Sequence, residues 1–147
     1  MLPITQFLAT LCCTLFTGAA VYINFVEHPA RMGCDTKTAA TVWAPSYQRA
    51  TAMQASLAIV SLVAGVAAWI LGGGIPWLLG ATLIGLVIPF TFIVIMPTNQ
   101  RLLEPGRDLT SDETRTLLEK WGRLHAVRSL LSLMASMIFL VQLLRIS

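Results

Sequence analysis

The chain has 147 residues, of which 56% are hydrophobic and only 12% are charged, and its mean hydropathy is +0.74. Soluble domains carry about 25% charged residues, so this composition excludes a disordered tail, a secreted disulfide scaffold and most soluble enzymes. The net charge of +3 is accounted for by basic residues that flank membrane helices, and no nucleic-acid partner is expected. The length suits one integral-membrane domain, residues 1–147.

Four apolar segments are long enough to cross a bilayer, which takes about 20 residues of helix. The sequence predicts spans over about residues 4–26, 50–71, 76–96 and 124–144. The predicted fold is therefore all-α, an up-down transmembrane four-helix bundle with an amphipathic helix before the last span. Because no lysine or arginine precedes the first apolar segment, we expect a retained span there and not a signal peptide.

Turn and breaker residues mark the ends of the predicted helices. The connection before the second span contains Trp43 and Tyr47, which we expect at the membrane interface. Residues 72–76, Gly-Gly-Gly-Ile-Pro, end the second helix and open the third. Pro89 removes a backbone donor within the third span and is expected to kink it, whereas Pro97 is expected to end it.

The segment before the fourth span predicts an amphipathic helix that continues into that span. Thr110 and Glu113 fit a capping box, in which the Thr110 hydroxyl accepts from the amide of Glu113 and the Glu113 side chain reaches back. Apolar residues then recur at helical spacing, namely Leu117, Leu118, Trp121 and Leu124.

Charged residues are concentrated at one end of the predicted bundle. Nine of the ten basic residues and all seven acidic residues lie in or beside the connections after the first and third spans. The opposite end holds the N-terminus, the glycine turn and Arg145. Because cytoplasmic loops are rich in Lys and Arg, the charged end is predicted to be cytoplasmic in the inner or plasma membrane, with both termini non-cytoplasmic.

Several polar motifs gather at this charged end. Asn24 and His28 are four residues apart on one helical face, and Trp121, His125 and Arg128 share another face by an i, i+4, i+7 pattern. We expect the first and fourth helices to bring both imidazoles to one shared pocket, because polar side chains facing lipid are costly. The candidate site residues are Asn24, His28, Arg31, Tyr47, Arg49, Gln54, Asn99, Trp121, His125 and Arg128.

Most of these residues also have a structural explanation. His28 can hydrogen-bond the last carbonyls of the first helix, and Asn99 can cap a helix or form a turn. Trp121 can belong to an aromatic belt, and the arginines can anchor helices at lipid headgroups. Arg128 differs from the other arginines, because it lies within an apolar run and requires a partner.

The sequence offers little for a metal or disulfide framework. Cys12, Cys13 and Cys34 have neither the count nor the spacing for such sites, and we interpret them as packing residues. His28 and His125 supply only two of the three or four ligands that zinc requires. A haem or copper ion held by these two histidines remains an alternative.

Five short motifs are the most distinctive part of the chain: residues 24–31 (NFVEHPAR), 47–49 (YQR), 89–91 (PFT), 96–99 (MPTN) and 121–128 (WGRLHAVR). Together they resemble the anthrone oxygenase-like family of small four-helix membrane proteins, which in bacteria is classed as a domain of unknown function. The resemblance covers nearly the whole chain, and the Pro-Thr-Asn and Trp-x-x-x-His-x-x-Arg elements are its most recognisable parts.

The resemblance implies a monooxygenase that acts with O2 on a lipophilic aromatic, anthrone- or quinol-like molecule, without an organic cofactor. His125 would be the base, His28 a second acid/base, and Arg128 and Asn99 would stabilise developing charge. Substrate binding would fall to Asn24, Arg31, Tyr47, Arg49, Gln54 and Trp121. The alternatives are a haem- or copper-binding redox protein and a non-enzymatic assembly or transport partner.

The expected partners are a lipophilic small molecule and the lipid bilayer. A homo-oligomer is also possible by composition, because the small residues Gly65 and Ala68 can form a helix contact.

Overall fold

A computed structural model describes residues 1–146 as long helices joined by short turns. The elements, with η marking π-helical segments, are α1 (Leu2–Tyr22), η1 (Ile23–Glu27), α2 (His28–Met32), α3 (Thr36–Ala68), η2 (Trp69–Gly73), α4 (Ile75–Phe90), η3 (Thr91–Ile95), α5 (Met96–Leu102) and α6 (Asp112–Ile146). The π-helical segments join successive elements into four helices that are each long and apolar enough to cross a membrane. The predicted all-α fold is thus confirmed.

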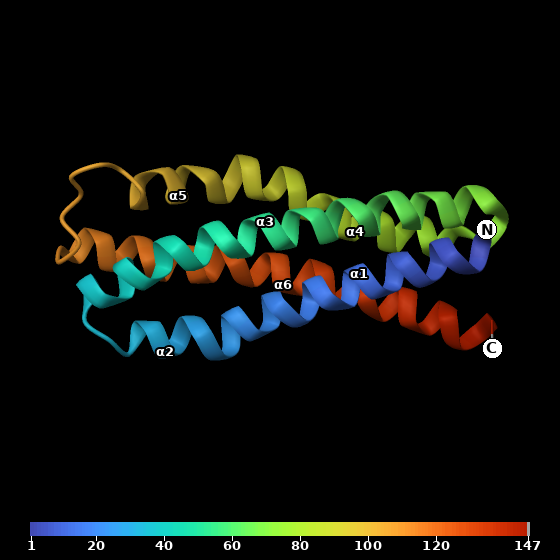
Figure 1. Ribbon diagram of the computed structural model, residues 1–147, viewed down its shortest axis with the longest axis horizontal. Coiled ribbons are helices and arrows are strands. Elements are labelled where there is room, and N and C mark those ends of the chain that lie inside the picture. Colours follow the sequence, from blue (N-terminus) through green and yellow to red (C-terminus); the bar gives the residue numbers. More distant parts are fainter. Residues whose placement is uncertain (147) are drawn as a thin grey trace.

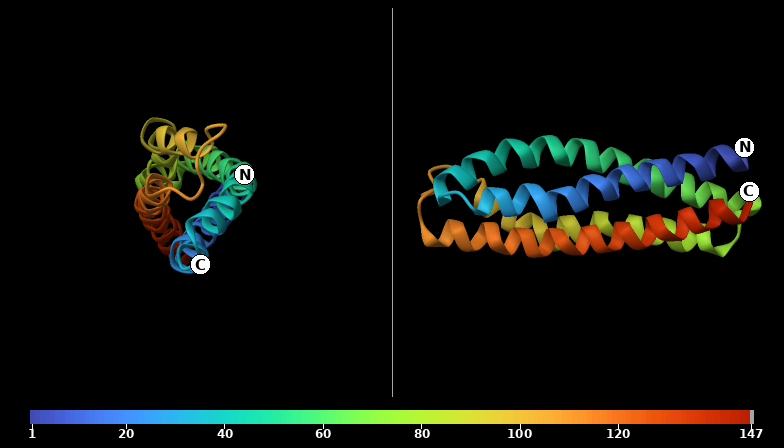
Figure 2. Two further views of the ribbon diagram at one scale, coloured as in Figure 1. Left: turned by 90° about the vertical axis from the view of Figure 1, so that its left-hand side faces the viewer. Right: turned by 90° about the horizontal axis from the view of Figure 1, so that it is seen from below.

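The four helices form an elongated antiparallel bundle (Figure 1). α1 packs mainly against α3 and α6, and α4 packs against the same two helices, so α1 lies diagonally opposite α4. The end-on and side views show the same arrangement (Figure 2). Both termini and the α3–α4 turn lie at one end, and the α2–α3 and α5–α6 connections lie at the other, which places the charged connections together (Figure 1).

The half of the bundle nearest the termini is tightly packed. Trp77 on α4 stacks on Phe139 of α6, with 5.1 Å between the ring centroids, and both side chains are fully buried. Gly80 allows this contact, because a Cβ there would lie 2.3 Å from Phe139. Aromatic stacking of this kind stabilises beyond the burial of the ring area alone.

Small polar side chains also join the helices in this half. The Thr17 and Ser136 hydroxyls are 2.8 Å apart, and Ser136 donates to the Cys13 sulfur at 3.3 Å. Ser61 donates to the backbone carbonyl of Ala9 at 2.9 Å. Such hydrogen bonds between small residues are typical of helix contacts in membrane bundles.

The glycine turn has the predicted form, whereas Pro97 does not end a helix. Gly72 and Gly74 have φ values of 93° and 92°, in the region that favours glycine. Pro89 lies inside α4, which changes to the π-helical η3 after Phe90. Pro97 then occupies the start of α5, where a missing backbone donor is tolerated, and the helix continues to Leu102.

The second helix begins at Thr36 and not near residue 50. Asp35 caps it, since its carboxylate accepts from the Thr38 amide at 3.0 Å. Hydrogen bonds from the Thr38 side chain and amide hold the pKa of the Asp35 carboxyl below its usual value. Trp43 is therefore helical, and its side chain is only 1% exposed, so it packs inside the bundle.

The predicted capping box at Thr110 is also wrong. The Thr110 amide and hydroxyl both donate to Asp108, which lowers the pKa of the Asp108 carboxyl, and Glu113 pairs with Arg101 instead. Ser111 caps α6, because its hydroxyl accepts from the Thr114 amide at 3.2 Å. From there α6 runs without interruption through the last predicted span, as expected.

Gly65 and Ala68 lie inside the bundle and not on an outer face. Both residues are buried, and a Cβ at Gly65 would lie 3.0 Å from Ala81 and 3.1 Å from Phe139. Their small size therefore serves the contact of α3 with α4 and α6. The expected oligomer contact through these two residues is not supported.

The close approach at Gly80 predicts a measurable cost of added volume. Gly80→Ala should lower the free energy of unfolding by about 1–3 kcal/mol, because Phe139 is enclosed and cannot move aside. Thermal unfolding in detergent measures the effect. Gly18→Ala is the control, since a Cβ there meets nothing within 4 Å, and an equal loss in both variants would contradict the packing argument.

The charge distribution predicts which end of the bundle faces the cytoplasm. Cys34 is exposed at the charged end, and it should react with an impermeant maleimide in inverted vesicles but not in intact cells. In a Cys34→Ser background, Ile75→Cys at the opposite end should show the reverse pattern. Labelling of Cys34 in intact cells would invert the proposed orientation.

Candidate functional site

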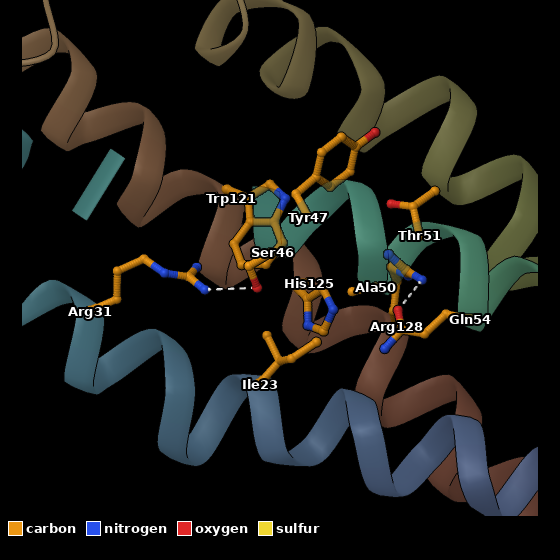
Figure 3. A pocket seen from close by; sticks show the side chains of 10 residues that line it. All are labelled: Ile23, Arg31, Ser46, Tyr47, Ala50, Thr51, Gln54, Trp121, His125 and Arg128. Carbon is orange, nitrogen blue, oxygen red and sulfur yellow. Dashed lines mark hydrogen bonds between the residues drawn. The ribbon is translucent and has the colours of Figure 1, made fainter. Parts of the chain in front are cut away.

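A small cavity of about 10 Å³ lies inside the charged end of the bundle, between η1, α2, α3 and α6. Trp121, His125 and Arg128 of α6 line it together, as their spacing predicts. Figure 3 shows their side chains directed toward those of α3, with Arg31 at one end of the group and Arg128 at the other. The full lining is Ile23, Arg31, Ser46, Tyr47, Ala50, Thr51, Gln54, Trp121, His125 and Arg128.

The amide of Asn24 fixes the orientation of His125. Asn24 Nδ2 donates to the backbone carbonyl of Gly122 at 3.1 Å, so Asn24 Oδ1 must face the imidazole. His125 Nδ1 lies 2.7 Å from that oxygen and therefore carries the proton. His125 is only 1% exposed. In the neutral ring, Nε2 is thus left with a free lone pair, and no described residue hydrogen-bonds to it.

Ser129 is a site residue that the motif analysis missed. Its hydroxyl donates to Asn24 Oδ1 at 2.5 Å, and the same oxygen also accepts the hydrogen bond from His125 Nδ1. Ser129 follows His125 by four residues on α6, so the i, i+4 spacing was available as a signal. Serine is common in transmembrane helices, and the spacing alone did not distinguish it.

Arg128 is buried beside neutral groups. Its Nη2 donates to Gln54 Oε1 at 2.9 Å, and its guanidinium lies 5.5 Å from the centre of the Phe16 ring. Gln54 is the partner that the position of Arg128 in an apolar run required. Among the described residues, no carboxylate pairs with Arg128, and Arg128 Nε and Gln54 Nε2 are buried without an acceptor. The pair therefore offers two donor nitrogens without acceptors.

Arg31 closes the other end of the cavity. Its side chain is 3% exposed, and it pairs with Glu27 one turn earlier. Arg31 Nη2 also donates to Ser46 Oγ of α3 at 3.3 Å, and Ser46 donates to Glu27 (Figure 3). Arg31 Nε and Nη1 are buried without an acceptor. This link between η1, α2 and α3 separates the cavity from the end of the bundle.

Aromatic rings form one wall of the site. Trp121 contacts both imidazoles, with centroid distances of 5.3 Å to His28 and 4.9 Å to His125. Trp43 meets Trp121 edge-on at 5.8 Å and stacks on Tyr47 at 5.0 Å. These contacts hold Trp121 within the bundle, so it is a core residue here and not part of an exposed aromatic belt.

The structure does not bring the two histidines to one shared pocket. His28 lines an open groove with Asn24, Glu119, Gly122, Arg123 and Ala126, whereas His125 lines the enclosed cavity. Trp121 contacts both rings and belongs to the lining of the cavity alone. His28 packs closely on α6, since a Cβ at Gly122 would lie 2.3 Å from its Nε2.

Two further predicted residues lie outside the cavity. Arg49 is exposed in a shallow groove on the outer side of α3, beside Val42 and Met53. Asn99 on α5 is 1% exposed, and both atoms of its amide lack a hydrogen-bond partner among the described residues. Neither residue is among those that line the cavity of His125.

An apolar slot of about 180 Å³ adjoins the small cavity. It lies between α3 and the rod formed by α4, η3 and α5, and its lining includes Ile59, Ile88 and Phe92. The slot and the cavity share Tyr47, Thr51, Gln54 and Arg128. These four residues thus have the larger, apolar slot on one side and the smaller, polar cavity on the other.

The two histidines do not form a joint haem or copper site in this arrangement. His125 lines a cavity that is too small for haem, its Nδ1 is committed to Asn24, and His28 lines a different groove. Within residues 1–146, no three histidine, cysteine or acidic side chains are grouped as a metal site. These residues therefore do not fit a haem or a copper ion bound by both histidines.

A model of the anthrone oxygenase family matches residues 43–138, which include the α6 motif and the α3 side of the cavity. The chain belongs to the anthrone oxygenase family. It is 32% identical over 154 aligned residues to the anthrone oxygenase tpcL of Aspergillus fumigatus, covering 97% of this chain and 94% of that protein. No solved structure matches the chain. Membership of the anthrone oxygenase family indicates an oxygenase.

The contacts of Asn24 predict the tautomer of His125 in this anthrone oxygenase family member. Nitrogen-15 spectra of histidine-labelled His28→Gln protein should show neutral His125 protonated at Nδ1. Asn24→Leu should convert this signal to a mixture of tautomers, because the acceptor for the Nδ1 proton is lost. Glu104→Gln at an exposed site is the control. If His125 is protonated at Nε2 in the His28→Gln protein that retains Asn24, the hydrogen bond from Nδ1 to Asn24 is contradicted.

Proposed function

We propose that this protein oxygenates a lipophilic aromatic molecule that carries an acidic methylene conjugated with a carbonyl, such as an anthrone. Family membership supports the oxygenase class, and tpcL is named an anthrone oxygenase. The observation that carries the finer assignment is the state of His125. Its Nδ1 proton is held by Asn24 at 2.7 Å, and its ring lines a cavity that adjoins an apolar slot. A base next to an apolar slot suits such a substrate.

In this proposal the substrate lies in the apolar slot, which it enters from the bilayer. The slot is lined mostly by apolar side chains, including the exposed Ile59 and Phe92 at its edge. Arg128 and Gln54 form its polar end and hold free N–H donors. These donors suit the carbonyl oxygen of the substrate, which becomes an oxyanion when the methylene loses its proton.

The first half of the reaction forms a hydroperoxide. His125 lines the small cavity and not the slot, so this step places the methylene where the two spaces adjoin. There Nε2 of His125 takes one methylene proton, and the negative charge spreads to the carbonyl oxygen near Arg128. The resulting anthrolate gives one electron to dioxygen, and the carbon radical and superoxide combine to form a C–O bond. The peroxide anion then takes the proton from His125, so the imidazole returns to its neutral form.

The second half forms the quinone and water. His125 takes the remaining proton from the same carbon while the O–O bond breaks and the new carbonyl forms. The departing hydroxide takes that proton from His125 and becomes water. One oxygen atom enters the product and the other leaves as water, so the substrate supplies every electron and no outside reductant is needed.

This proton balance requires one base, and the geometry favours His125 for that role. His28 lies in the other groove and packs on Gly122, so we assign it to positioning Trp121 and not to proton transfer. Asn99 has a buried amide without a partner, but it lies outside both cavities. We therefore assign the stabilisation of the oxyanion to Arg128 and Gln54.

The base assignment predicts a large loss of activity in His125→Gln. Removing a general base costs about 10²–10⁴-fold, and the loss should appear in two assays. One is oxygen consumption with an anthrone. The other is exchange of the methylene hydrogens for deuterium without oxygen, which reports proton removal alone.

His28→Gln is the matched control for this experiment, because it removes the other imidazole near Trp121. It should retain deuterium exchange within a few-fold of the unaltered protein. Equal losses in both variants would contradict the assignment of the base to His125 alone. Stoichiometric copper or a Soret band in active protein would contradict a free imidazole base.

A further inference from the structure

The small cavity beside His125 cannot hold the aromatic substrate. Its volume of about 10 Å³ is close to the roughly 10–15 Å³ that admits a single water molecule. The adjoining slot, at about 180 Å³, is the larger space. Of the two reactants, only dioxygen, with two heavy atoms, is close to this size, and it fits if the lining side chains move slightly.

The lining of the cavity carries an unusual excess of positive charge. Arg31 and Arg128 stand at its two ends, and no carboxylate is among the lining residues (Figure 3). Glu27, which does not line the cavity, pairs with Arg31 and balances its charge. Among the residues that line the cavity, the buried donors without acceptors are Arg31 Nε, Arg31 Nη1, Arg128 Nε and Gln54 Nε2.

Buried donors and unpaired cations are costly unless an acceptor or an anion arrives. A neutral water molecule can accept from some of these groups, but it leaves the excess charge unbalanced. A reactant that gains negative charge inside the cavity balances it during the reaction. In a buried environment this attraction is much stronger than in water.

We propose that this cavity is the dioxygen site, and that Arg31 and Arg128 stabilise the superoxide formed in it. This inference rests on the proposed function. One electron passes from the anthrolate in the slot to dioxygen in the cavity, which gives a carbon radical and superoxide. Their combination forms the C–O bond, and the peroxide anion takes the proton held on His125 Nε2.

The shared wall places the two reactants side by side. Tyr47, Thr51, Gln54 and Arg128 line both spaces, so the slot and the cavity adjoin at these four side chains. The inference requires the reacting carbon and dioxygen to meet at this boundary. Arg31 lines only the small cavity. Although Glu27 pairs with its Nη2, the Arg31 Nε and Nη1 donors have no acceptor and can act on dioxygen but not on the organic substrate. Arg31 is therefore the residue that tests the inference.

The first experiment measures the dependence of the rate on oxygen concentration at saturating anthrone. Arg31→Gln should lower kcat/KM for oxygen roughly 10- to 100-fold, and anaerobic deuterium exchange should stay within twofold. Arg31→Lys keeps the charge and should restore most of the loss. Arg123→Gln removes an exposed arginine of α6 and should leave kcat/KM for oxygen unchanged.

A second experiment uses the unaltered protein and an inorganic anion. Azide is small and negatively charged, so it should inhibit in competition with oxygen and not with the anthrone. Competition with the anthrone instead would overturn the inference, because the cavity would then belong to the organic substrate. This measurement decides the question even where Arg31→Gln fails to fold.

The outcomes separate the two proposals. If the unaltered protein does not catalyse deuterium exchange, the proposed function fails and the dioxygen site fails with it. If exchange is normal but Arg31→Gln leaves kcat/KM for oxygen unchanged, only the dioxygen site is overturned. An equal loss of exchange and of oxygen reactivity in Arg31→Gln would assign Arg31 to the organic substrate or to the fold.

Discussion

The charged end of this bundle depends on the hydrogen bonds of one amide, that of Asn24. It joins the first helical rod to α6 through the carbonyl of Gly122, the imidazole of His125 and the hydroxyl of Ser129. Inside an apolar bundle each of these groups would be costly without a partner. The amide satisfies them together, and in doing so it leaves the second ring nitrogen of His125 free.

The two halves of the bundle have different physical roles. Near the termini, stacked aromatics and small residues pack the helices closely, as at Trp77, Gly80 and Phe139. Near the charged connections, buried arginines and amides keep donors without acceptors. Unsatisfied donors lower stability, and the close packing near the termini offsets part of that cost.

The separation of a polar cavity from an apolar slot suits an oxidation without a redox cofactor. An aromatic ring system needs an apolar space, whereas the negative charge that forms on oxygen needs cations and donors. Arg128 and Gln54 line both spaces, so in the proposed mechanism a single pair of side chains serves both requirements. Arg31 belongs to the polar space alone.

The four helices, the charge asymmetry and the α6 motif could all be predicted from the order of the amino acids. Long apolar segments report directly on membrane-length helices, and the spacing of Trp121, His125 and Arg128 depends only on helix geometry. The family also followed from the motifs, since they are short, polar and local. Asn24 lies in one of these motifs and was therefore predicted as a site residue. Its hydrogen bonds to Gly122, His125 and Ser129 were not predicted.

Which polar residues meet depends on how the helices pack, and it could not be predicted from the sequence. The sequence predicts that His28 and His125 lie at a similar depth in the bundle. The rotation of their helices, however, places His28 in an open groove and His125 in the small cavity. Arg49 likewise turns outward on α3. Rotation about a helix axis is set by contacts with neighbouring helices, and hydropathy does not encode it because both faces of these helices are apolar.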